Sequence, residues 1–240
     1  ADNFTDIRND AWLEVLEGIK VLESQSDSVF GSPTSPLLVT LSGDSQPCLP
    51  YMLDTIENVG LNDASTTAMA RETGNRATVW NAYRTLIQTF GVVVLDINST
   101  RFDEVYEKFA SARNRKDVKE FSAIDWVDLT KLFKAVIVRE TGTVFPQNPF
   151  EQLKLSIMAL LRKRTTGKAL DYAQAQEYKK VSHSIILTVP TLPDATEKNG
   201  TGVFMPSRPS DGSKRPIGYY AKGGSFEDVI KKRVEFETMS

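Results

Sequence analysis

The stretch PLLVTLSGDSQPCLPYMLDTIENVGLND, residues 36–63, sets the start of the fold. Residues 36–41 form a short apolar run that is typical of a buried strand. Residues 49–63 predict a helix that ends at Gly60, with Leu61 as the apolar residue that often follows a left-handed cap. Between them lies a polar loop, SGDSQPC (42–48), without Lys or Arg. The sequence therefore raises the question of whether this loop is an active site.

Composition excludes several classes of protein. The 240 residues hold 29 Lys+Arg against 31 Asp+Glu, and this slightly acidic balance argues against nucleic-acid binding. The longest uninterrupted apolar run, GVVVL (91–95), is far too short to span a membrane. One cysteine, Cys48, and one histidine, His183, allow neither an internal disulfide nor a structural zinc cluster.

The centre of the chain is rich in helical patterns, in which apolar residues recur at intervals of three and four. In the helix predicted at 125–142, the apolar stripe expected to be buried includes Leu132. In the helix predicted at 145–164, Asn148 is a typical N-cap and Pro149 a typical first helical residue. The predicted helices cover 5–25, 77–91 with a stop at Gly91, 100–116, 125–142 with a stop at Gly142, and 145–164.

From about residue 181 the pattern becomes β-like. Residues 182–190, 201–205 and 216–221 predict strands, some of which should pair with the strand at 36–41, and 226–236 predicts a final helix. The fold class is α+β. We expect one domain over 1–240, with a helix-strand-helix start (1–63), a helical part (64–180) and a β-rich end (181–240).

Local motifs give little chemistry. No stretch matches a phosphate-binding glycine loop with its lysine, and His183 lies in an apolar strand pattern where a packed histidine is the ordinary case. Gly200 and Gly202 could let backbone amides approach a phosphate, but a simple hairpin with turn residues is favoured. Neighbouring carboxylates are too common in acidic helices to indicate catalysis.

Seven segments, taken in order, resemble one family, the nucleotide-binding domain shared by pyruvate phosphate dikinase and phosphoenolpyruvate synthase. They are FGSPTSPLLVTL, LPYMLDTIENVGLND, ETGN, AYRTLIQTFG, FPQNPFEQLKLSI, GTGVFMPSRPSDG and FEDV, which together cover most of residues 30–229. The resemblance implies an ATP-grasp-like fold, here incomplete and with a large helical insert. In this family ATP phosphorylates a histidine on a separate swivelling domain, and the phosphoryl group then passes to pyruvate.

The residues that contact phosphate in the family are replaced here. Counting in register places Ser42 and Gln46 at two family arginines, and Ser207 at the arginine of a Thr-Arg-Asn-Pro stretch. Asp44 adds a negative charge where phosphate would lie. A neutral hydroxyl cannot supply the bidentate, permanently charged clamp that a transferring phosphoryl group needs. The resemblance therefore implies a scaffold that has lost its chemistry.

The family's opening Gly-Gly-Lys-Gly loop would precede residue 1, and its acidic and glutamine ligands would follow residue 240. We therefore expect a degenerate, truncated relative that is not an enzyme: a structural or interaction subunit that works with other protein subunits, with no catalytic residue, metal or cofactor. Two alternatives stay open. One is a nucleotide-binding module or dikinase part that keeps affinity for ATP and magnesium through Arg162, Lys168 and Arg208; the other is a regulator that mimics a dikinase domain. A chain beginning at Ala1 slightly favours a plastid or mitochondrion over the cytosol.

Overall fold

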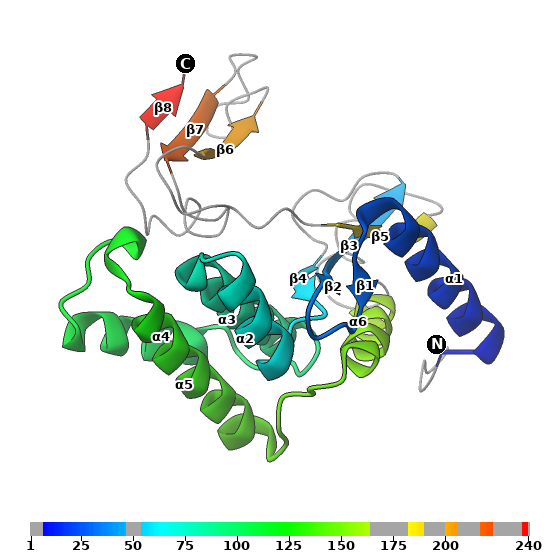
Figure 1. Cartoon of the computed structure of the whole chain (residues 1–240), viewed down its shortest axis with the longest axis horizontal. Coiled ribbons are helices and arrows are strands. Elements are labelled where there is room, and N and C mark those ends of the chain that lie inside the picture. Colours follow the sequence, from blue (N-terminus) through cyan, green and yellow to red (C-terminus); the bar gives the residue numbers. More distant parts are fainter. Residues whose placement is uncertain are drawn as a thin grey trace, which may run out of the picture.

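The computed structural model describes residues 7–46, 54–163, 182–189, 200–205, 217–222 and 237–239 (Figure 1). Its helices are α1 (Asn9–Ser26), α2 (Asp63–Glu72), α3 (Arg76–Val93), α4 (Thr100–Ala112), α5 (Ala123–Thr141) and α6 (Pro149–Lys163), with a 3₁₀ turn at Val118–Glu120. Its strands are β1 (Val29–Phe30), β2 (Pro36–Leu37), β3 (Val39–Gln46), β4 (Thr55–Val59), β5 (Ser182–Thr188), β6 (Gly200–Met205), β7 (Ile217–Lys222) and β8 (Glu237–Met239). This combination of helices and small sheets confirms the α+β class.

Three small sheets contain the described strands. In the sheet β4-β3-β5, β3 is the central strand and runs antiparallel to both neighbours, with Leu41 opposite Ile56 and Leu187. The strands β6, β7 and β8 form a second antiparallel sheet, and β1 and β2 form a short parallel pair. The predicted strands at 36–41, 182–190, 201–205 and 216–221 are thus confirmed, as is the pairing between the first two.

The helix predicted at 49–63 is wrong in the part that the structure describes, because Thr55–Val59 is strand β4. Gly60 and Leu61 suggested the end of a helix. Gly60 does take a positive φ of 116°, but it follows a strand that pairs with β3 through a register shift, beside which Asn58 takes a left-handed φ of 60°. Both Ile56 and Val59 are fully buried. The β-branched residues therefore follow their ordinary strand preference.

A helix that the sequence reasoning missed follows this strand directly. Asn62 is the N-cap of α2: its side chain accepts a hydrogen bond from the backbone N–H of Ser65, and the Ser65 hydroxyl accepts one from the N–H of Asn62. This reciprocal pair of hydrogen bonds stabilises the first turn of a helix. The segment GLND thus ends a strand and starts a helix, within five residues of Val59.

The core is built around α3, which packs against α5 on one side and β4 on the other (Figure 1). Tyr83, Leu86, Ile87 and Phe90 of α3 are fully buried, as the helical pattern predicted. The predicted stop at Gly91 is wrong, because α3 continues to Val93. Gly91 permits close packing instead: a Cβ atom there would lie 2.5 Å from the ring of Phe102 on α4.

Two other predicted helix ends, at Asn148 and Gly142, are confirmed. At the start of α6, Asn148 Oδ1 accepts hydrogen bonds from the backbone N–H groups of Phe150 (2.9 Å) and Glu151 (3.4 Å). At the end of α5, Gly142 takes a left-handed φ of 71°. One residue of α5 was misplaced: Leu132, predicted in the buried stripe, is 42% exposed.

Several sequence predictions fall on other parts of the chain. The predicted helix at 226–236 and Cys48 lie outside the described residues. The division into 1–63, 64–180 and 181–240 stays a prediction. Among the helices that the structure describes, none combines the length and the apolar character that crossing a membrane requires.

Candidate functional site

The central strand β3 carries the position where the resemblance expects a phosphate-binding arginine. The sequence reasoning placed residues 42–48 in a loop, and this is wrong for residues 42–46, because β3 continues to Gln46. Ser42 pairs with Thr55 of β4 and with Ile186 of β5. Because Ser42 is paired with a strand on each side, this part of β3 stays extended.

The Ser42 side chain has a neutral partner. Its Oγ atom lies 3.2 Å from Thr55 Oγ1, so that the two hydroxyls form a hydrogen bond across the β3–β4 pair. One residue further along, the backbone N–H of Gly43 donates to the carbonyl oxygen of Asp54 at 3.1 Å. A hydroxyl pair can donate a hydrogen bond to an anion, but it brings no positive charge.

Of the three residues named for residual ATP binding, the structure places only Arg162. It lies in the last turn of α6, and its side chain is 53% exposed. Its guanidinium donates to the Asp96 carboxylate, with 2.7 Å between Nη2 and Oδ2. Lys168 and Arg208 lie outside the described residues.

The residue after Arg162 joins the same group of charges, which the sequence reasoning did not anticipate. Lys163 Nζ lies 3.5 Å from Asp54 Oδ2 and 3.5 Å from Asp96 Oδ1. Two basic side chains at the end of α6 therefore face two carboxylates, one from the segment before β4 and one from the segment after α3. The basic charge here is balanced locally, which weakens its attraction for phosphate.

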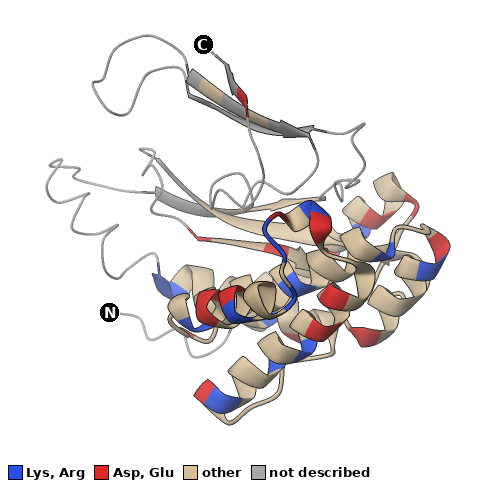
Figure 2. Cartoon of the chain, turned by 90° about the vertical axis from the view of Figure 1, so that its left-hand side faces the viewer, with Lys and Arg blue, Asp and Glu red and all other residues tan. Residues whose placement is uncertain are grey.

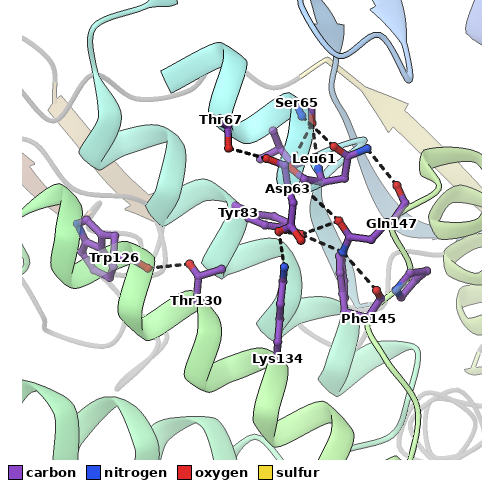
Figure 3. A network of polar contacts seen from close by, with 12 residues as sticks. Leu61, Asp63, Ser65, Thr67, Tyr83, Trp126, Thr130, Lys134, Phe145 and Gln147 are labelled. Carbon is purple, nitrogen blue, oxygen red and sulfur yellow. Dashed lines mark hydrogen bonds and ion pairs between the residues drawn. The ribbon is translucent and has the colours of Figure 1, made fainter. Parts of the chain in front are cut away.

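A polar network joins α2, α3 and α5 to the segment before α6 (Figure 3). Tyr83 Oη donates to Asp63 Oδ1 at 3.1 Å, and Gln147 Nε2 donates to Tyr83 Oη at 3.2 Å. The backbone N–H of Asp63 donates to Gln147 Oε1 at 3.0 Å, and Lys134 pairs with the Asp63 carboxylate. Four elements are thus held together by one carboxylate, one phenol, one amide and one ammonium group.

The electrostatics of this network favour structure over proton transfer. Burial raises the pKa of the Tyr83 hydroxyl far above its ordinary value; the hydrogen bond with Gln147 acts in the opposite direction, and the Asp63 carboxylate raises the pKa further. Tyr83 therefore stays neutral and serves as a hydrogen-bond donor. A general base would need a pKa nearer neutrality.

Gln152 forms a second link between the same regions, and its side chain is fully buried. Its Oε1 accepts from the backbone N–H of Gly60 at 3.1 Å, and its Nε2 donates to the carbonyl oxygens of Leu61 (2.9 Å) and Pro146 (2.8 Å). The sequence signal for this role was its place in the landmark FPQNPFEQLKLSI, although no role was assigned to it. Gln152 therefore fixes the turn that follows β4.

Metal chemistry finds no support among the described side chains. Within these residues, no three His, Cys, Asp or Glu side chains gather closely enough to hold an ion. In the view of Figure 2, Lys and Arg alternate with Asp and Glu along the described helices.

The described part of the chain is therefore an α+β domain with a buried helical core and a central strand that carries a neutral hydroxyl pair. Comparison with known proteins gives its family. The chain is 30% identical over 220 residues to the chloroplastic pyruvate, phosphate dikinase of Mesembryanthemum crystallinum, a match that covers 91% of this chain and 23% of that protein. It is 31% identical over 223 residues to the pyruvate, phosphate dikinase of Giardia intestinalis, covering 90% of this chain and 25% of that protein. No family model matches the chain.

The chain thus carries a domain of the pyruvate, phosphate dikinase family, as the seven landmarks indicated. It spans about a quarter of the length of the curated relatives it matches.

Proposed function

We propose that this chain is a non-catalytic relative of the ATP-binding domain of the dikinases and acts as a structural or interaction subunit of a larger assembly. The observation that carries the proposal is the pair Ser42 and Thr55, whose hydroxyl oxygens lie 3.2 Å apart at the position where the resemblance expects an arginine. In place of a charged clamp, β3 has a neutral hydrogen bond to its neighbour strand.

The loss of charge matters because phosphoryl transfer depends on positioning and on compensation of negative charge. Removing a single preorganised donor from a site that stabilises developing charge costs about 10²–10³ in turnover. Gln46 and Ser207 are further positions where the resemblance expects arginine and the sequence has a neutral residue. Several such losses together would leave a rate close to the uncatalysed one.

The basic residues that remain give further support. Arg162 and Lys163 are balanced by Asp96 and Asp54, so that a nucleotide would have to compete with two carboxylates of the same chain. We also propose that the domain keeps an ATP-grasp-like arrangement, because two of the family landmarks, PLLVTL and GTGVFM, each contribute a strand to an antiparallel sheet, β3 to the sheet β4-β3-β5 and β6 to the sheet β6-β7-β8.

Hydrogen exchange tests the loss of nucleotide binding at this strand. We expect the amides of β3 (Val39–Gln46) and β4 (Thr55–Val59) to exchange at the same rate with and without millimolar MgATP. The signal of α4 (Thr100–Ala112) serves as an internal reference. A magnesium-dependent slowing confined to β3 and β4 would contradict the proposal and favour a nucleotide-binding module.

Isolation of the native protein tests the proposed role in an assembly. The chain should elute at a mass well above 26.7 kDa and with other protein subunits in fixed proportion. Recovery with a full-length dikinase would favour a regulator instead, and recovery only as a free chain would contradict the assembly.

We further propose a plastid or mitochondrial location. One relative, that of Mesembryanthemum crystallinum, is named as chloroplastic, whereas the name of the Giardia intestinalis relative carries no location. Cell fractionation tests this: recovery in the cytosolic fraction alone would contradict it.

A further inference from the structure

We draw no further inference here: the strongest candidate, the side-chain cluster at the end of helix α6 in which Lys163 lies between Asp54 and Asp96, belongs to the site already described, and nothing among the described residues shows what ligand it would take.

Discussion

Replacing Gln152 by methionine probes how the turn after β4 is held. Methionine keeps nearly the same side-chain volume but removes the three hydrogen bonds to Gly60, Leu61 and Pro146. A typical hydrogen bond contributes about 1 kcal/mol, and a buried polar group left without a partner costs about 1–3 kcal/mol. Because Gln152 is fully buried, we expect the free energy of unfolding to fall by about 3–4 kcal/mol.

Urea denaturation followed by tryptophan fluorescence measures this loss. With a slope of about 3 kcal/mol per molar urea, the midpoint should fall by about 1 M. Gln25→Met on the exposed surface of α1 is the control, and it should change the free energy of unfolding by less than about 0.5 kcal/mol. If Gln152→Met behaved like this control, Gln152 would not hold the turn.

Three further predictions follow from the core, the charges and the candidate site. Gly91→Ala should lower the free energy of unfolding by about 1–3 kcal/mol, because the new methyl group would lie 2.5 Å from the Phe102 ring. Gly18→Ala is the control, because no atom lies within 4 Å of its new methyl group, and it should not lower the free energy of unfolding. Thermal unfolding of the two variants measures the difference. Burial alone would raise the pKa of Asp125, but hydrogen bonds from Ser122 and the Arg115 guanidinium hold it below its ordinary value. The stability that Asp125 contributes is therefore present above about pH 4 and is lost as the pH falls through the folded-state pKa, so the melting temperatures of wild type and Asp125→Asn should converge on acidification and not diverge. Ser42→Arg should not create MgATP binding by calorimetry, because one charge does not rebuild the site, and saturable binding by this variant would contradict that.

The sequence predicted the helices where one apolar face is repeated over several turns. For α3, Tyr83, Leu86 and Phe90 lie where the pattern placed them, and Asn148 and Gly142 mark real helix ends. These signals are local, because a cap or a helical face depends on residues a few positions apart.

The errors have long-range causes. The strand β4 was taken for part of a helix because Gly60 and Leu61 resemble a left-handed helix cap, whereas the positive φ of Gly60 follows a strand that is paired with β3. Gly91 was taken for a stop, although its lack of a side chain makes room for Phe102 on another helix. Neither cause is visible before the partner strand or helix is known.

In the candidate site, too, the sequence located single residues, whereas their contacts depend on distant parts of the chain. Ser42 was located by counting along the family landmarks, but its hydrogen bond to Thr55 depends on the pairing of β3 with β4. The ion pairs of Arg162 and Lys163 with Asp96 and Asp54 join residues that lie 66 or more positions apart. The sequence identified the position where the family arginine is missing. The structure shows that a neutral hydroxyl lies beside Ser42 and that carboxylates lie beside Arg162 and Lys163.

Isothermal titration calorimetry of the purified 240-residue chain with MgATP tests the central claim most directly. The account predicts no saturable heat up to millimolar nucleotide, with or without magnesium, because the hydroxyl pair of Ser42 and Thr55 provides no positive charge for phosphate. Magnesium-dependent binding at micromolar concentration would show that the site is still functional and would contradict the account.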